Sequence, residues 1–160
     1  FIHELAHNSN QRIYMRDIKF AIIGYAKNNV KTNRVGNFAD EITEIILDDK
    51  YKGALKGIED YSHVIIIYVM DKVKDFVISH VPQGKEGVPD VGIFACRCPR
   101  RPNPIAMTTV PLLKVKDNSI KVKGLDIIDG TPVLDIKPYW PQYDAIDGYK
   151  IPDWVNKLEF

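Results

Sequence analysis

The sequence predicts a single all-β domain, because short apolar runs alternate with turn residues and no long amphipathic helix interrupts them. The length of 160 residues is about that of one domain. The β-branched run from Tyr61 to Met70, YSHVIIIYVM, predicts a strand that is covered on both faces. These features are typical of a closed barrel or a sandwich.

The other elements follow from the remaining apolar runs and the turns between them. We expect strands over Ile18–Tyr25, with a bulge or close backbone approach at Gly24, and over Glu41–Leu47, Gly92–Cys96, Met107–Val115 and Ser119–Val122. The last two form a hairpin, and an Asp-Gly turn predicts strand, turn and strand over Gly124–Pro138. Residues 71–80 fit either a helix or a strand, residues 27–40 and 81–91 read as loops, and residues 51–55 suit a short helical turn.

The chain divides into three parts. Residues 1–14 lack an initiating Met and an apolar signal core and read as a leader, tag or extension, and Met15 could begin the domain. Residues 15–141 form the domain, and residues 142–160 read as a tail that packs on the domain or on a partner subunit.

Composition excludes several classes of protein. A net charge of +1 gives no global attraction for nucleic acid, so any binding of phosphate must be local. The four histidines are scattered and Cys96 and Cys98 alone are too few for a zinc site, so we expect no metal and two reduced thiols in a cytoplasmic protein. No apolar run approaches the ~20 residues that span a bilayer, and the Rossmann glycine fingerprint is missing.

Two blocks concentrate prolines, glycines and charges: Phe94 to Ile105, FACRCPRRPNPI, and Gly124 to Tyr139, GLDIIDGTPVLDIKPY. Pro99, Pro102 and Pro104 exclude a helix interior or a central strand, so the first block is a rigid, irregular arm. A backbone pinned in this way either shapes a binding pocket or only closes the barrel.

These blocks, with RPNPIAM, GIFACRCP and the upstream LKGIEDYSHV, resemble the TrmO/YaeB family of tRNA methyltransferases from about Ile18 to Tyr139. The resemblance implies a mainly β fold with short helical segments: a single antiparallel β-barrel, which makes it a non-Rossmann methyltransferase. It also implies a homodimer that binds S-adenosyl-L-methionine near the subunit interface and methylates N6 of threonylcarbamoyl-adenosine in the anticodon loop of tRNA. Ala21 and Ala106 depart from the proline and glycine usual in the family.

The resemblance assigns cofactor contacts to Arg97 and Met107, and to Gly124, Leu125 and Asp126 before the Asp-Gly turn. Phe94, Ile105 and Met107 suit apolar walls beside a sulfonium, and Asn103 belongs to the same loop. A proton must leave the substrate nitrogen, and Asp126 and Asp135 are the catalytic candidates. Asp129 is the alternative, although an Asp in an Asp-Gly turn usually bonds local backbone.

Other side chains have a structural reading beside a functional one. Asp135 is placed to pair with Lys137 on the same strand face, and His63 suits a structural histidine better than a base. For RNA, the candidates are Arg100, Arg101, Lys137 and Tyr139, with a rim of Lys27, Lys31 and Arg34. Trp140 and Tyr143 could stack on an unpaired base or fill an interface.

Three functions stay open at this point. The first is the tRNA methyltransferase. The second is a module that binds S-adenosylmethionine or a nucleotide without turnover, which the departure at Ala106 motivates. The third is a dimerisation domain whose loop motif only closes the barrel.

Overall fold

The computed structural model describes residues 19–32 and 38–160. The expected extension over residues 1–14, the alternative start at Met15 and the basic residue Arg34 lie outside the described residues.

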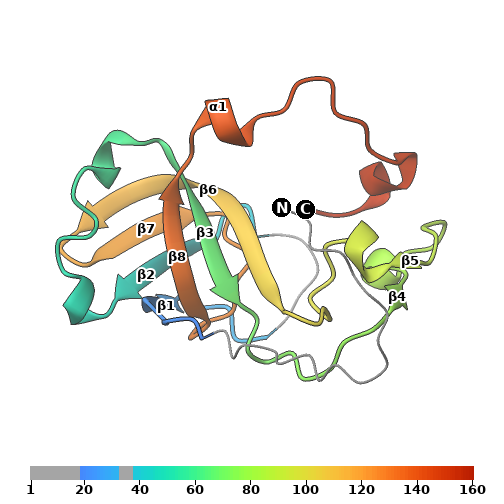
Figure 1. Ribbon diagram of the computed structural model, residues 1–160, viewed down its shortest axis with the longest axis horizontal. Helices are drawn as coiled ribbons and strands as arrows, with labels where there is room; N and C mark the ends of the chain where they lie inside the picture. Colours follow the sequence, from blue (N-terminus) through green and yellow to red (C-terminus); the bar gives the residue numbers. More distant parts are fainter. Residues whose placement is uncertain (1–18, 33–37) are drawn as a thin grey trace, which may run out of the picture.

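Six strands form a closed barrel in which every neighbouring pair is antiparallel (Figure 1). The order around the barrel is β1 (Gly24–Lys27), β2 (Ile42–Leu47), β7 (Ser119–Lys123), β6 (Ile105–Lys116), β3 (His63–Val69) and β8 (Pro132–Pro138). The sequence left a sandwich open as the alternative. The closed sheet excludes it and confirms the mainly β fold with a single antiparallel barrel.

Alternating side chains fill the interior of the barrel. The fully buried members come from β2, β3, β6, β7 and β8, and they include Ile45, Ile66, Val110, Ile120 and Val133. Ile65, on the other face of β3, is also only 5% exposed. Strand β3 is therefore covered on both faces over most of its length, as its β-branched run predicts.

Gly24 allows β1 and β2 to approach closely. A Cβ atom at this position would lie 2.2 Å from the backbone oxygen of Ile46. The close approach predicted at Gly24 is confirmed, but the predicted strand over Ile18–Tyr25 is displaced. The strand begins at Gly24: the Ile23 N–H still donates to the Val133 carbonyl at 2.9 Å, but Ile22 before it is 39% exposed.

Three other predicted elements are wrong. Residues 71–80 form neither a helix nor a long strand, and only β4 (Ser79–His80) pairs, with β5 (Val91–Gly92). In place of the strand expected over Gly92–Cys96, the chain forms a single 3-10 turn, η4 (Ile93–Ala95). Residues 125–128 are not a strand, because Leu125 and Ile127 enter the core from an irregular segment.

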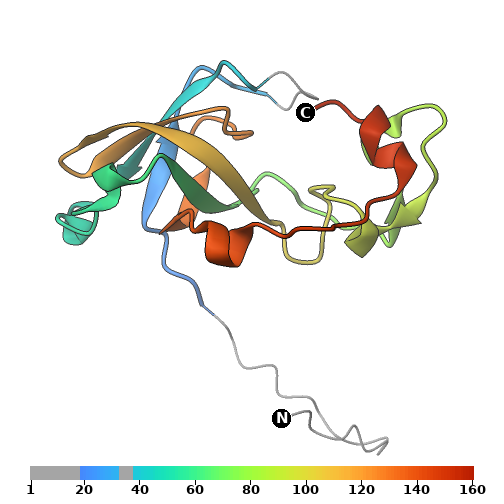
Figure 2. The same cartoon turned by 90° about the horizontal axis from the view of Figure 1, so that it is seen from above.

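The remaining helices are short. They are η1 (Asp49–Tyr51), η2 (Ile58–Asp60), η3 (Pro82–Gly84), α1 (Pro141–Asp144) and η5 (Asp153–Lys157). Figures 1 and 2 both show the barrel at one end of the molecule and β4 and β5 at the other, with the C-terminal segment running between them. None of the helices among the described residues is long and apolar enough to cross a membrane.

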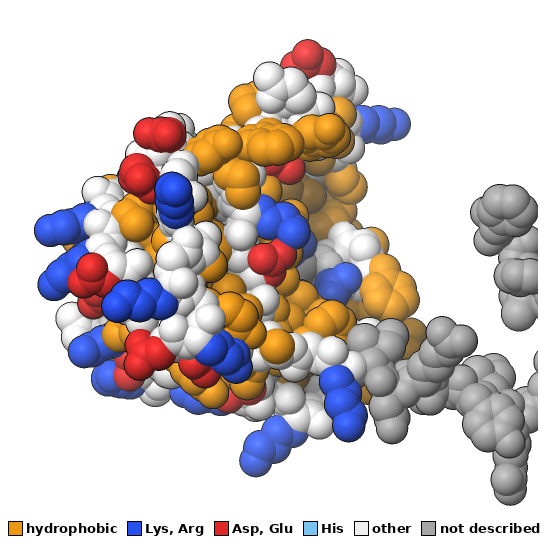
Figure 3. All heavy atoms as spheres, turned by 60° about the vertical axis from the view of Figure 1, so that its left-hand side comes forward, with side chains coloured by type: hydrophobic (Ala, Val, Ile, Leu, Met, Phe, Trp, Pro, Cys, Tyr) orange, Lys and Arg blue, Asp and Glu red, His pale blue; other side chains and the backbone are white. Residues whose placement is uncertain are grey.

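The last residues of the chain lie against the loop around η3. Gln83 and Glu159 exchange two hydrogen bonds of 2.7 and 3.0 Å, Lys85 pairs with Glu159 at 2.9 Å, and Lys157 donates to the Gly87 carbonyl. The end of the C-terminal segment thus contacts the η3 loop of the same chain, and whether the rest of the segment packs on a partner subunit stays a prediction. Figure 3 shows hydrophobic side chains gathered where the barrel gives way to the rest of the chain, while charged side chains of both signs cover the barrel.

Asn28 and Asp129 tie the loop after β1 to the Asp-Gly turn. The Asn28 amide donates to the buried Thr43 hydroxyl at 3.0 Å and to the Ile127 carbonyl at 3.1 Å. Asp129 accepts from the Asn28 backbone N–H at 2.9 Å and from the Lys31 ammonium at 2.6 Å. The carboxylate of Asp129 therefore bonds a loop about a hundred residues away, and its role in the described structure is architectural.

We expect Gly24→Ala to unfold at markedly lower urea concentration than the wild type, because the new methyl group cannot fit beside the Ile46 carbonyl without separating β1 from β2. The matched control is Gly92→Ala, where the Cβ meets no atom within 4 Å. Equal unfolding midpoints for the two variants would contradict the close approach.

The hydrogen bonds from Lys31 and from the Asn28 backbone lower the pKa of Asp129. A lowered folded-state pKa stabilises the fold above the unfolded value of about 3.9, and this stabilisation is lost as the pH falls through the folded-state pKa. We expect Asp129→Asn to lower the free energy of unfolding at pH 7, and the difference from wild type to shrink below pH ~4. Denaturant unfolding over this pH range checks it, with the exposed Asp147→Asn as control; a difference that does not depend on pH would refute the assignment.

Candidate functional site

The arm from Arg97 to Pro104 is anchored to the start of β6. The Arg97 guanidinium donates to the Met107 carbonyl at 2.7 Å, so the two residues expected at the cofactor lie in contact. Arg101 donates to the carbonyls of Ile93 and Cys96 at 2.9 and 2.6 Å, and its guanidinium lies 5.7 Å from the centre of the Phe94 ring. The two arginines hold the arm against η4 and β6.

Tyr68 joins three segments of the chain at one end of the barrel. Its hydroxyl donates to the Asp126 carbonyl at 2.6 Å and lies 3.2 Å from the Thr108 hydroxyl on β6. Burial raises the pKa of Tyr68; the Asp126 carboxylate also raises it and the Arg97 guanidinium lowers it. The hydroxyl thus joins β3, β6 and the segment before the Asp-Gly turn, and Arg97 of the arm contacts the same stretch of β6 at the Met107 carbonyl.

The segment from Gly124 to Asp126 has one residue in the core and one at the surface. Gly124 has a φ of 81° and donates its N–H to the Glu41 carbonyl at 2.9 Å. Leu125 is fully buried in the core, so in this structure it is not open to a ligand, in contrast to its expected cofactor contact. Asp126 is exposed, which leaves its carboxylate at the surface beside Tyr68.

Three apolar side chains of η4 and the start of β6 are open to solvent. Phe94 is 79% exposed, Met107 50% and Ile105 38%. Asn103 is exposed, and its carbonyl accepts the Ile105 N–H at 2.8 Å. Of the residues expected at the cofactor, Arg97 thus contacts Met107, and Asp126 contacts Tyr68 through its carbonyl. Ile105 and Met107 alternate with the less exposed Ala106 and Thr108, so they lie on the outer face of the arm end of β6.

Ala106 is a regular strand residue. It lies opposite Tyr68 in the β3–β6 register, and it packs against the core. A glycine is not needed here, because the backbone of Ala106 does not have a positive φ. The departure at Ala106 is therefore compatible with the arm geometry, and the exposed Ala21 lies outside the barrel strands.

Asp135 and Lys137 form the ion pair that the sequence offered as the structural reading of Asp135. The Lys137 ammonium lies 2.6 Å from Asp135 Oδ2, and the Ile136 N–H donates to Asp135 Oδ1 at 2.9 Å. The hydrogen bond to Asp135 raises the pKa of Lys137. Both side chains belong to β8, next to the register shift opposite Ile67 and Tyr68.

The expected RNA-binding residues are divided between two places. Arg100 pairs with Asp75, and Arg101 is occupied with backbone carbonyls as described above. Tyr139 follows β8, donates its N–H to the His63 carbonyl at 3.1 Å and packs edge-on against the His63 ring at 6.3 Å. The His63 ring also bonds the Ser62 hydroxyl at 2.9 Å, in line with a structural histidine.

Trp140 and Tyr143 remain at the surface at the start of the C-terminal segment. Their ring centres lie 5.7 Å apart, and the two side chains are 45% and 79% exposed. Of the lysines expected at the rim, Lys31 pairs with Asp129, as described above.

The sequence missed Tyr68 and Thr108. Tyr68 stands inside an apolar strand, where a tyrosine reads as core, and its hydroxyl has no sequence signal. The available clue is that a buried tyrosine hydroxyl requires a hydrogen-bond partner, which marks a place where the core meets polar groups.

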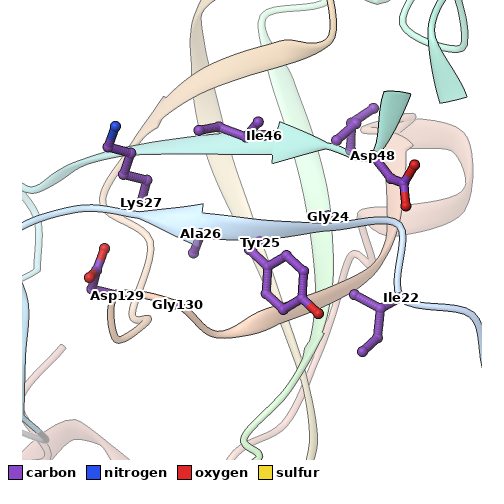
Figure 4. Close-up of a pocket in the computed structure, with 10 residues that line it drawn as sticks. Ile22, Gly24, Tyr25, Ala26, Lys27, Ile46, Asp48, Asp129 and Gly130 are labelled. Carbon is purple, nitrogen blue, oxygen red and sulfur yellow. The ribbon is translucent and has the colours of Figure 1, made fainter. Parts of the chain in front are cut away.

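Away from this junction, a groove of about 480 Å³ lies on the outer wall formed by β1, β2 and the Asp-Gly turn (Figure 4). Ile22, Tyr25, Ile46, Asp48 and Asp129 are among its lining residues, and none of the residues expected at the cofactor is. We take the Tyr68 junction as the candidate site, because the residues expected at the cofactor belong to its segments and none of them lines the groove. In residues 19–32 and 38–160, no three His, Cys, Asp or Glu side chains are placed to hold a metal ion.

Comparison with known proteins gives consistent results. The family model of the tRNA-methyltransferase O N-terminal domain matches residues 24–145. An S-adenosyl-L-methionine-binding protein of Archaeoglobus fulgidus is 40% identical over 129 residues, which cover 78% of this chain and 91% of that protein. The tRNA (adenine(37)-N6)-methyltransferase of Mus musculus is 38% identical over 107 residues, 66% of this chain but 25% of that protein.

The fold agrees with solved structures. A crystal structure of TrmO from Pseudomonas aeruginosa matches with a TM-score of 0.68 and 27% identity over 84% of this chain and 62% of that one. This chain therefore spans less than two thirds of the solved TrmO chain. Since the family model covers both motif blocks and all six barrel strands, the chain belongs to the tRNA-methyltransferase O family.

Proposed function

We propose that this chain is an S-adenosylmethionine-dependent tRNA methyltransferase that acts on N6 of adenine 37, with threonylcarbamoyl-adenosine as the substrate base. The observation that carries the proposal is the Tyr68 junction: the Tyr68 hydroxyl bonds Asp126 of the second motif block and lies 3.2 Å from Thr108, next to the Met107 carbonyl that accepts from Arg97 of the first block. The names of the relatives, which include S-adenosylmethionine binding and adenine-37 methylation, support it.

The residues at the junction fit S-adenosylmethionine, which supplies a methyl group activated by its sulfonium. Arg97 uses one N–H group on the Met107 carbonyl, and its other donors suit the carboxylate of the cofactor. The Asp126 carboxylate and the backbone of Gly124 suit the ribose hydroxyls, and the buried Leu125 supports this segment from the core. Phe94, Ile105 and Met107 provide apolar walls, and Asn103 provides polar contacts at the end of the arm.

Of the two catalytic candidates, we favour Asp126 for the proton that leaves the substrate nitrogen. Asp126 is exposed beside the buried Tyr68, and a carboxylate there can accept a proton during attack.

For tRNA, we propose that Arg100, Lys137 and Tyr139 face the anticodon loop, with Arg101 acting mainly by holding the arm. Arg100 and Lys137 already have carboxylate partners, so phosphates would compete with Asp75 and Asp135 for them. Exposed aromatic rings such as Tyr143 suit stacking on an unpaired base.

We further propose that the working unit is a homodimer in the cytoplasm. Phe76, Ile78, Phe94 and Met107 are between 50% and 79% exposed on and beside the arm, which is costly for an isolated chain. A second subunit covering these side chains would also enclose a cofactor that the single chain leaves open on one side.

The alternative is a module that binds S-adenosylmethionine without methylating tRNA. The archaeal relative named for binding alone favours it, because this chain spans 91% of that protein. The two functions share the cofactor surface and differ in whether methyl groups reach tRNA.

The direct test uses methyl-labelled S-adenosylmethionine and tRNA that carries threonylcarbamoyl-adenosine. We expect label at N6 of position 37, and we expect Arg97→Gln to lower kcat/KM at least tenfold by removing the charge that faces the cofactor carboxylate. The exposed Lys150→Gln serves as control. Calorimetry that detects cofactor binding, with no label on any tRNA, would instead establish the binding module.

Tyr68→Phe isolates the junction itself. The ring stays in the core, but the Asp126 carbonyl and the Thr108 hydroxyl lose a partner, so we expect the affinity for S-adenosylmethionine to fall roughly tenfold. Calorimetric titration measures it, with the half-exposed Tyr25→Phe as the matched control. Unchanged affinity in a folded Tyr68→Phe protein would remove the junction from the cofactor site.

A further inference from the structure

Three lysines line a second hollow, on the outer wall of the barrel away from the candidate site. This hollow of about 250 Å³ is formed by Glu44, Lys114, Lys116, Ser119 and Lys121. In the strand register Glu44 lies opposite Lys121, Lys121 lies opposite Lys114, and Ser119 lies opposite Lys116. Strands β2, β7 and β6 therefore bring Lys114, Lys116 and Lys121, the lysine row, around one hollow.

The lysine row is not neutralised by the fold. Like charges directly opposite on neighbouring strands destabilise a sheet, and Lys121 and Lys114 are such a pair. None of the three ammonium groups forms an ion pair with a described residue, whereas Lys123, further along β7, pairs with Asp40 at 2.8 Å. Glu44 accepts from the Ser119 hydroxyl at 3.0 Å, and a single carboxylate leaves an excess of positive charge.

The barrel does not need these lysines for its core. Their side chains point outward. On β7, Ile120 and Val122 on either side of Lys121 fill the interior. A cluster that costs stability and packs nothing suits an anion from outside, and in a chain with a net charge of +1 its positive potential must act locally.

The lysine row and the candidate site share one strand. Met107 and Lys114 are both exposed on β6, and the register shift between Leu112 and Lys114 helps to place Lys114 outward. At about 3.3 Å per residue, the two positions lie ~23 Å apart along the strand. A nucleic acid whose base reaches the candidate site can lay its backbone on the lysine row only if it is elongated, as a tRNA arm is.

We propose that the lysine row binds backbone phosphates of tRNA at a distance from the base that is modified. The inference rests on the proposed function and adds a second contact to it. It assigns affinity rather than chemistry to Lys114, Lys116 and Lys121, because phosphate contacts position a nucleic acid without reading its sequence.

The test is the binding of fluorescently labelled tRNA over a series of salt concentrations. We expect Lys114→Gln/Lys121→Gln to bind roughly tenfold more weakly at low salt and to reduce the slope of log affinity against log salt by about 1 to 2. The control, Lys52→Gln/Lys150→Gln, removes the same charge from exposed positions elsewhere and should bind like the wild type. In methylation assays, the first variant should raise KM for tRNA and leave kcat and cofactor affinity unchanged.

The outcomes separate the inference from the proposed function. If the wild type binds and methylates tRNA and both double variants do so equally well, the lysine row has no role in binding and the proposed function stands. If both double variants lose affinity equally, the loss comes from the lower total charge of the protein and not from the position of the lysines, and the inference fails. If the wild type does not bind tRNA at low salt, both are overturned.

Discussion

The structure depends on β8, which pairs with β1 on one edge and with β3 on the other and so closes the barrel. Closure removes the exposed strand edges that a six-stranded open sheet would present. Strands β7 and β8 are consecutive in the chain but not neighbours in the barrel. The segment between them must therefore cross the mouth of the barrel. Gly124 to Asp129 makes this crossing, with Leu125 and Ile127 buried in the core.

The crossing brings the Asp126 carbonyl to Tyr68. On one side of β3, Ile67 lies opposite Asp135 and Tyr68 opposite Val133, so Leu134 is an extra residue on β8. Such bulges bend a strand and re-aim side chains beside functional sites. The Tyr68 hydroxyl is then satisfied by two polar groups from separate segments. The site is thus positioned by a core residue, and its stability and its geometry are coupled.

The sequence predicts most of the barrel because its strands follow strong local patterns. Strand β3 has a long β-branched run, and β6 and β7 are separated by a short turn. The strand and the hairpin predicted from these patterns are both confirmed. The run LDII, residues 125–128, has the same apolar character but is not a strand, because its residues cross the barrel mouth instead of pairing. The first strand is displaced to Gly24 because pairing with β2 and β8, and not apolar content, decides where it begins.

The site was less accessible to sequence analysis for a related reason. Arg97, Met107 and Asp126 came from a family resemblance, whereas no local pattern marks Tyr68, whose hydroxyl bonds the Asp126 carbonyl and lies beside Thr108, the residue after Met107. The local clustering of charge is likewise set by strand register and cannot be read from the composition. A net charge of +1 suggests an even surface, yet strand register alone places Lys121 opposite Lys114, seven residues along β6 from the exposed Met107. Long antiparallel strands can therefore carry exposed apolar side chains, here at the proposed cofactor site, at one end and cations without an ion-pair partner at the other, with no sign of this division in the composition.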